Sequence, residues 1–308
     1  MKWKGLIYSA LFLPISLLSQ TESDGLFMAK NNFCGGFVAG FSQWNHYWEG
    51  NFYRSNENIG TVSSNSIMLM GNYGINGKTN LIFTLPYIQN QASAGTLIGQ
   101  QGLQDLNVFL KRELYAINFK GWLTSFNGTL GLGLPTTNYV ADYLPLSIGM
   151  KSQTASAKMM IDVQKKQFFI TASAFGMLRR NIEIDRDAYY TTKMIYSNSV
   201  QMPSVTGYNI RTGWRKDPDH YIEVILDGMN TIGGFDIRRN DMPFPSNNMD
   251  AIKVGLNLKW GIPGINGLSA MAMAMQTVAG RNVGMTQSVA AGAVYQFEIS
   301  SPKKTNKK

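Results

Sequence analysis

The sequence is poor in charge, cysteine and histidine. Charged residues make up 15% of the 308 positions, well below the roughly 25% of a typical soluble domain. Cys34 is the only cysteine, so an internal disulfide is excluded, and we expect it to be a small buried residue. Two histidines, His46 and His220, and one cysteine offer no metal-ligand cluster. We therefore expect no metal and no cofactor.

Long apolar runs are missing after the first twenty residues. Residues 1–20 begin with Lys2 and Lys4 and continue with an apolar run to Leu18 and then Ser19. This layout predicts a secretory signal peptide. No later stretch has 18 uninterrupted apolar residues, which excludes a membrane protein made of helices.

The positive charge is concentrated at the ends of the chain. The formal net charge is +9, of which residues 1–20 carry two lysines and the tail SPKKTNKK carries four, leaving +3. A nucleic-acid partner is therefore not expected for an exported chain. We interpret residues 300–308 as a basic periplasmic tail.

What the chain has instead is alternation with a period of two. In AIKVGLNLKW (251–260), apolar residues from Ile252 to Trp260 alternate with Lys253, Gly255, Asn257 and Lys259. Such alternation predicts strands with two different faces. We expect about twelve: 36–49, 60–75, 79–92, 102–116, 121–136, 145–164, 167–181, 204–216, 220–233, 249–262, 267–281 and 285–299.

The connections between these segments are alternately short and long, apart from a short last one at 282–284. Short turns at one end and long loops at the other are typical of antiparallel barrels that span the outer membrane. In lipid, only a closed barrel satisfies every backbone group without helices. The prediction is an all-β, transmembrane, antiparallel outer-membrane β-barrel of a Gram-negative bacterium.

Aromatic residues support this interpretation. Five of them fall on the outward phase near strand ends beside the short turns, as expected for an aromatic girdle at a membrane interface: Tyr73, Trp122, Trp214, Trp260 and Phe297. The expected organisation is a signal peptide (1–20), an N-terminal segment that could act as a plug (21–35), the barrel (36–299) and the tail (300–308).

The opposite phase carries the residues expected to face the interior. They are charged residues of both signs together with two methionines: Met68, Met70, Asp105, Lys111, Lys158, Asp162, Arg211, Arg215, Glu223, Asp227, Lys253 and Lys259. A tight turn at Pro218–Asp219 would place Arg215 opposite Glu223 and Arg211 opposite Asp227. We expect these pairs to be structural salt bridges and the interior to be narrow or closed.

Methionines offer a soft apolar lining suited to hydrophobic ligands. Met68 and Met70 are assigned to the interior. In SAMAMAMQT (269–277), the alternation leaves the direction open, and we assign Met271, Met273 and Met275 to the lipid side because alanines would otherwise form that face.

Catalysis is not expected. His220 follows Asp219 in a predicted periplasmic turn, and His46 lies between two tryptophans with no recognisable serine nucleophile. Barrel enzymes typically place such groups near the outer rim, so the chain is predicted not to be an enzyme.

Two stretches resemble a known family. GLQDLNVFLKREL (102–114) and GTLGLGLPTTNY (128–139) are similar to consecutive strands of the outer-membrane barrels assigned to a phenol-degradation "meta pathway". The family is related to porins for hydrophobic compounds, and the signal peptide resembles those of Bacteroidota. The match comprises Gly102, Asp105, Leu106, Leu134, Pro135 and Thr136, and it departs at Gln104 and Thr137.

Two functions follow as hypotheses. The first, which the resemblance also implies, is a channel for passive passage of small, including hydrophobic, solutes. The second is an accessory subunit of a larger outer-membrane machine for secretion or barrel assembly, with loop 182–203 as a contact surface for protein partners. The expected partners are outer-membrane lipid, a small hydrophobic ligand and, in the second case, other proteins.

Overall fold

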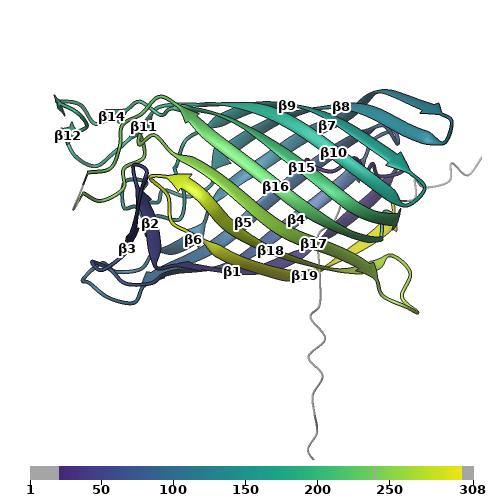
Figure 1. Ribbon diagram of the computed structural model, residues 1–308, viewed down its shortest axis with the longest axis horizontal. Coiled ribbons are helices and arrows are strands. Elements are labelled where there is room, and N and C mark those ends of the chain that lie inside the picture. The colour runs from purple at the N-terminus through teal and green to yellow at the C-terminus, as the bar shows by residue number, and fades with distance from the viewer. Residues whose placement is uncertain (1–20, 239–240, 300–308) are drawn as a thin grey trace, which may run out of the picture.

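The computed structural model describes residues 21–238 and 241–299, and within them the chain forms a closed antiparallel barrel (Figure 1). Twelve long strands of these residues build the wall, in chain order: β1 (Asn32–Trp44), β4 (Val62–Gly74), β5 (Thr79–Ala92), β7 (Asp105–Phe119), β8 (Trp122–Pro135), β9 (Thr154–Lys165), β10 (Phe168–Arg179), β15 (Ser204–Asp217), β16 (His220–Ile232), β17 (Asp250–Gly261), β18 (Leu268–Arg281) and β19 (Gln287–Glu298). No helix in the described part of the chain is long and apolar enough to cross a membrane.

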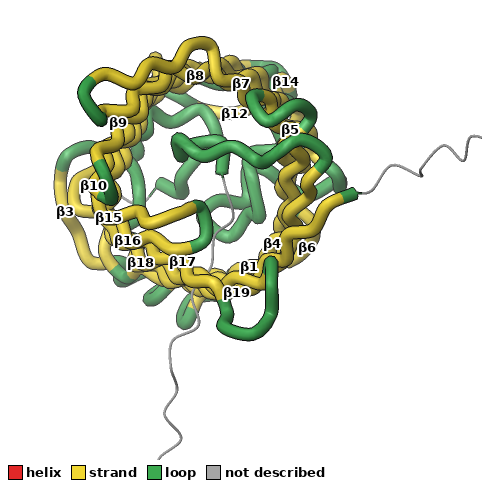
Figure 2. Tube along the Cα trace, turned by 90° about the vertical axis from the view of Figure 1, so that its right-hand side faces the viewer, coloured by secondary structure: helices red, strands yellow, loops and turns green. Residues whose placement is uncertain are grey.

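The barrel closes through the pairing of its first and last strands. Phe33 pairs with Phe297 and Gln43 with Gln287, and each other wall strand pairs with its neighbours in sequence. Closure removes the unpaired edges that an open sheet would expose. Figure 2, which looks along the barrel, shows the ring of strands with loop segments inside it.

Short turns connect the strands at one end. Lys120 and Gly121 both have positive φ, at 49° and 80°, between the paired residues Phe119 and Trp122. Two such residues form the hairpin turn whose twist matches that of the strands. These turns and the start of β1 lie at the same end of the barrel (Figure 1).

The long connections gather at the other end, where they carry short strands (Figure 1). These are β2 (His46–Glu49), β3 (Phe52–Ser55), β6 (Gln101–Leu103), β11 (Ile182–Glu183), β12 (Tyr189–Tyr190), β13 (Met194–Ile195) and β14 (Ser199–Val200). Loop residues form their own apolar cluster, in which Val200, Ile182 and Tyr189 from one loop pack with Ala141 and Phe244 from two others.

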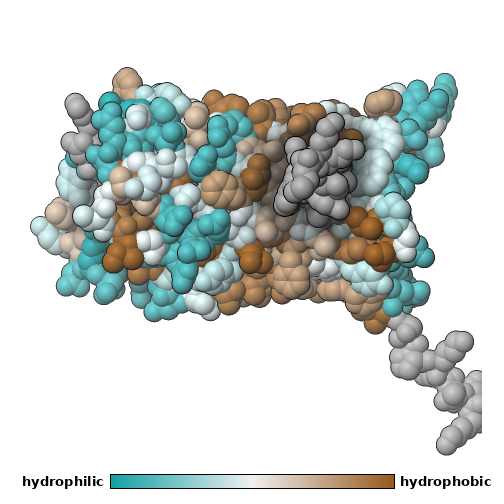
Figure 3. All heavy atoms as spheres, turned by 90° about the horizontal axis from the view of Figure 1, so that it is seen from below, coloured by the Kyte–Doolittle hydropathy of each residue, from teal (hydrophilic) through white to brown (hydrophobic). Residues whose placement is uncertain are grey.

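The two faces of the wall differ as the alternation predicts. Leu256, Val224 and Ile222 of neighbouring strands are exposed on the outside, whereas Glu223 and Asn257 are buried. Seen from the side, apolar side chains gather around the middle of the barrel and polar ones towards its ends (Figure 3). The apolar outer band and polar interior are the pattern of a transmembrane barrel.

The predicted strands are close to the observed ones, with two differences at the loop end. The expected strand 36–49 ends at Trp44, because residues 46–49 pair with β3 in a loop hairpin instead of continuing in the wall. The expected strand 145–164 begins only at Thr154, and Leu146 and Ile148 are instead buried in a loop. At its start, the barrel includes residues 32–35, which the sequence assigned to the preceding segment.

The predicted register of the β15–β16 hairpin is wrong by two residues. Arg211 lies opposite Ile225 and Arg215 opposite Tyr221. The turn at Pro218–Asp219 pairs Asp217 with His220, which is already one residue from the predicted register, and an irregularity between Arg215 and Asp217 shifts the pairing of the residues before it by one more. Arg211 therefore does not lie opposite Asp227, nor Arg215 opposite Glu223.

The predicted signal peptide (1–20) and tail (300–308) lie outside the described residues.

Candidate functional site

The candidate site is the barrel interior. Among the residues predicted to face it, Met70 and six charged residues are buried within the wall: Lys111, Asp162, Arg211, Arg215, Glu223 and Lys259. The remaining five, half-buried, lie on the same face of their strands: Met68, Asp105, Lys158, Asp227 and Lys253.

An apolar cluster fills one side of the interior. Met70 packs there with Val38, Met271 and Val294, and Met28 from the N-terminal segment joins them. The predicted outward direction of Met271, Met273 and Met275 is wrong, since Met271 is 0% exposed and packs against this cluster with Met273 beside it. Met271 lies opposite Lys259, which faces the interior from the neighbouring strand. The alanines that alternate with these methionines therefore face outward.

Residues 21–31 precede β1, and Ser23, Asp24 and Met28 of this segment are buried inside the barrel, whereas Ala29 and Lys30 are exposed. The ammonium group of Lys111 on β7 donates to the carbonyl oxygens of Thr21 (3.0 Å) and Leu26 (2.8 Å) and to Oδ1 of Asp24 (3.0 Å). The ring of Phe27 lies 4.8 Å from the same ammonium nitrogen. Within the described residues, every hydrogen bond of this ammonium group thus goes to the N-terminal segment.

A second lysine holds the segment from β9. Nζ of Lys158 lies 3.2 Å from Oε1 of Glu22 and also donates to the hydroxyl of Ser23. Between these contacts, Gly25 sits so close to Asp162 that an added β-carbon would overlap the carboxyl group. The absence of a side chain at Gly25 therefore lets the segment lie against the wall.

The two carboxyl groups of the segment are held ionised. Burial alone would raise the pKa of Glu22, but Lys158, the Ser23 hydroxyl and Arg211 together lower it from 4.5 to about 2. Burial likewise opposes ionisation of Asp24, and Lys111, the Thr21 amide and Arg211 bring its pKa below its usual value. Both residues carry a negative charge into the interior at neutral pH.

Other ion pairs lie within the wall itself. Nη1 of Arg211 lies 2.9 Å from Oε1 of Glu223, which also accepts from Asn257 at 2.7 Å. Nη1 of Arg215 lies 3.1 Å from Oδ2 of Asp162, two strands away. The two salt bridges predicted from the sequence, Arg215–Glu223 and Arg211–Asp227, are therefore wrong: both arginines form ion pairs within the wall, but each with a different partner.

Three other predicted interior charges, Asp105, Asp227 and Lys259, have local partners. Tyr139 from a loop donates to Asp105 at 2.6 Å, and Asn209 donates to Asp227 at 2.9 Å. Lys259 lies 2.7 Å from Asp219 in the short turn. Burial raises the pKa of Asp219 and the charge of Lys259 lowers it. The net result is a pKa below the usual value.

The aromatic residues assigned to the girdle lie at strand ends beside the short turns. Trp214 and Trp260 stack with ring centroids 6.2 Å apart, and Phe297 contacts Phe33 at 5.6 Å. Trp122, which is 46% exposed, lies 4.5 Å from the ammonium nitrogen of Lys165, and Tyr73 is half-buried beside the turn 75–78. This arrangement supports an interfacial position for this end of the barrel.

The two histidines lie at opposite ends of the barrel, in a loop hairpin and in a short turn. His46 stacks on Tyr53 in the β2–β3 hairpin, with ring centroids 5.2 Å apart. Nδ1 of His220 lies 2.9 Å from Asp217 in a short turn. Within residues 21–238 and 241–299, no group of three or more potential metal ligands occurs.

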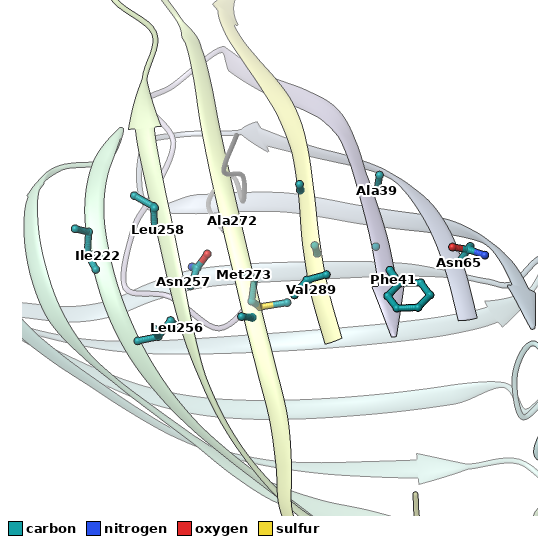
Figure 4. Close-up of a pocket in the computed structure, with 14 residues that line it drawn as sticks. Ala39, Phe41, Asn65, Ile222, Leu256, Asn257, Leu258, Ala272, Met273 and Val289 are labelled. Carbon is teal, nitrogen blue, oxygen red and sulfur yellow. The ribbon is translucent and has the colours of Figure 1, made fainter. Parts of the chain in front are cut away.

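A cavity of about 710 Å³ lies across six neighbouring strands from β16 to β4 (Figure 4). Much of its lining is exposed and apolar, including Ile222, Leu256 and Val289, and its floor contains the small residues Ala272 and Ala291. This hollow belongs to the outer surface that an outer-membrane barrel turns to lipid. Its lining also includes Met273 and Asn257, which the interior shares.

The sequence indicated the interior lysines but not their partners. Glu22, Asp24 and Gly25 lie in a short polar segment without alternation, and nothing local predicts which wall residue each would contact. The only available signal was the position of two carboxylates just before the first strand of a barrel with interior lysines.

Comparison with known proteins agrees with the fold. An outer membrane channel from Pseudomonas putida F1 is similar in structure over 89% of this chain and 98% of its own, with a TM-score of 0.71 and 14% sequence identity. The beta domain of the Bordetella autotransporter BrkA matches over 86% of this chain and 99% of its own, with a TM-score of 0.42 and 13% identity. No protein-family model and no curated protein sequence matches the chain.

The chain therefore has the fold of a Gram-negative outer-membrane β-barrel. The phenol-degradation resemblance stays a prediction that rests on two sequence motifs.

Proposed function

We propose that this protein is a channel of the Gram-negative outer membrane for passive passage of small solutes, and that its own residues 21–31 close the interior as a plug. The proposal also includes export by the signal peptide and a function that is not enzymatic. The observation that carries it is the set of contacts around Lys111, whose three hydrogen bonds all go to that segment.

These contacts distinguish a plug from a structural core. A wall that needed Lys111 for its own stability would pair it with another wall strand, as it pairs Arg215 with Asp162. Once the predicted signal peptide is removed, Lys111 would hold a segment that is joined to the barrel only through β1. Such a segment can leave without breaking any strand pairing.

Hydrophobic solutes are part of the proposal because of the interior methionines. Met70, Met271 and Met273 line one side together with Val38 and Val294. Thioether side chains are flexible and polarisable, so they adapt to apolar ligands of different shapes.

The test is single-channel conductance of the refolded protein in a planar bilayer. The intact chain is compared with a chain that lacks residues 21–27, which retains Met28 and all of β1. We expect rare, brief openings for the intact chain and steady current for the shortened one. If neither the intact nor the shortened chain conducts, the proposed channel function is contradicted.

The accessory-subunit hypothesis has one supporting observation. The loop 182–203 packs its own core through Val200 and Ile182, yet it leaves Tyr190, Met194 and Tyr196 exposed, the last by 86%. Exposed aromatic and methionine side chains are frequent in protein contacts. Recovery of the protein as a single species from gentle detergent extracts would contradict this hypothesis.

A further inference from the structure

The N-terminal segment has the chemistry of a ligand. Its first part carries the carboxylates of Glu22 and Asp24, and its second part carries the apolar side chains of Leu26, Phe27 and Met28. The carboxylates meet Lys158 and Lys111, and Met28, which is 1% exposed, enters the methionine cluster. The interior therefore binds one acidic and one apolar portion of the same short peptide.

The wall keeps a charge excess when the segment is taken away. Arg211 and Arg215 are neutralised by Glu223 and Asp162 of the wall. Lys111 and Lys158 form ion pairs only with the segment among the described residues. Ammonium groups in the interior without counter-charges are costly, most of all the fully buried one of Lys111, so the emptied site would favour an anion.

Apolar surface lies beside Lys158 and also where the segment enters the methionine cluster. The ring of Phe175 on β10 lies 5.7 Å from Nζ of Lys158 and belongs to the wall, so it stays when the segment leaves. Met70 and Met271 provide the surface that Met28 covers. A simple inorganic anion would neutralise the lysines but would leave this surface unused.

We propose that Lys111 and Lys158 form the binding site of the channel for small organic carboxylates with an apolar body, and that residues 22–28 occupy this site as an internal substitute for the solute. This inference rests on the proposed channel function and specifies its solute class. A carboxylate solute would then compete with the plug and promote its release.

The experiment uses the full chain and the probe 3-phenylpropionate, with the neutral alcohol 3-phenylpropanol as the matched control. Binding is measured by calorimetry on the folded protein in detergent, and current is measured in a bilayer under a potassium chloride gradient. The variants are Glu22→Gln/Asp24→Asn, which weakens the plug, and the same protein with Lys111→Met and Lys158→Met added.

We expect the Glu22→Gln/Asp24→Asn variant to bind 3-phenylpropionate about tenfold more tightly than the unchanged chain does, because a charged hydrogen bond of the competing plug is lost. The alcohol should bind to neither. Adding the two lysine substitutions should remove both the binding and the preference of the current for chloride over potassium.

The two proposals can fail separately. If the protein binds the carboxylate through the lysines but never conducts, the proposed channel function is wrong and the proposed binding site stands. If the current is steady but shows no preference for anions, and the acid and the alcohol bind equally, the proposed carboxylate site is wrong and the proposed channel function stands. In both cases, the variant that carries all four substitutions must be shown to be folded, by its heat-resistant migration on a gel.

Discussion

Two kinds of ion pair occupy the same interior. Arg215–Asp162 and Arg211–Glu223 join strands of the wall, whereas Lys111–Asp24 and Lys158–Glu22 join the wall to a terminal segment. The first kind cannot separate without distorting the sheet. The second can separate when the segment moves, after which its carboxylates return to water. In the proposed plug, the same chemistry that stabilises the wall would regulate access to the interior.

The largest expected effect comes from breaking a wall pair. Replacing Arg215 by Met leaves Asp162 buried without its partner, which should lower the free energy of unfolding by about 3–5 kcal/mol. Urea unfolding of the barrel refolded in lipid vesicles measures this change. The double variant Arg215→Met/Asp162→Leu should recover most of the loss, and failure to recover would show that the charge pair is not the cause.

Replacing Lys111 by Met should have a smaller effect on unfolding, about 2 kcal/mol, because Asp24 can move into water with the segment. The same substitution should increase the open probability in a bilayer, which Arg215→Met should not do while the barrel is folded. Equal losses of stability for Lys111→Met and Arg215→Met would remove the distinction between the two kinds of pair.

Lys158→Met should be milder still, about 1 kcal/mol or less, because this pair is partly hydrated. The side chain of Lys158 is 13% exposed and that of Glu22 is 29% exposed, against 0% for Lys111 and 4% for Asp24. Urea unfolding and open probability should both rank Lys158→Met below Lys111→Met. The reverse order would place the main anchor of the segment at Glu22.

Acid should leave the plug in place over most of the accessible range. The pKa of Glu22 is lowered from 4.5 to about 2, so the stability that its charge contributes is fully present above pH 4.5 and is lost as the pH falls through about 2. Asp24, whose pKa is also lowered, adds to this in the same direction. The open probability should therefore be constant from neutral pH to about 4.5 and rise below it.

The control for acid opening is the Glu22→Gln/Asp24→Asn variant, whose open probability should be high at every pH. Opening of the unchanged chain already between pH 7 and 5 would contradict the assignment of these carboxylates.

The barrel could be predicted from the sequence because it depends on local pattern. Alternation placed Lys111, Asp162 and Lys259 on one face of their strands, and the structure buries all three. Where two faces are both apolar, alternation separates them without saying which is outside, so Met271 was assigned to the wrong side. A local irregularity after Arg215 changed the register, because one displaced residue shifts the whole pairing before it.

The contacts of the N-terminal segment could not be predicted in the same way. Asp24 and Lys111 are 87 residues apart, and Glu22 and Lys158 are 136 apart. Such pairs are set by the closure of the barrel and by the fit of Gly25 against Asp162, which no short stretch of sequence contains.

The most direct test of the account is the reactivity of interior lysines towards a small amine-specific reagent, read by mass spectrometry of the folded protein in detergent. In the unchanged chain, Lys111, Lys158 and the wall-paired Lys259 should all be protected. In the Glu22→Gln/Asp24→Asn variant, Lys111 and Lys158 should become reactive while Lys259 stays protected, which serves as the internal control. If Lys111 reacts equally in both proteins, or stays protected in both, residues 21–31 are not a releasable plug.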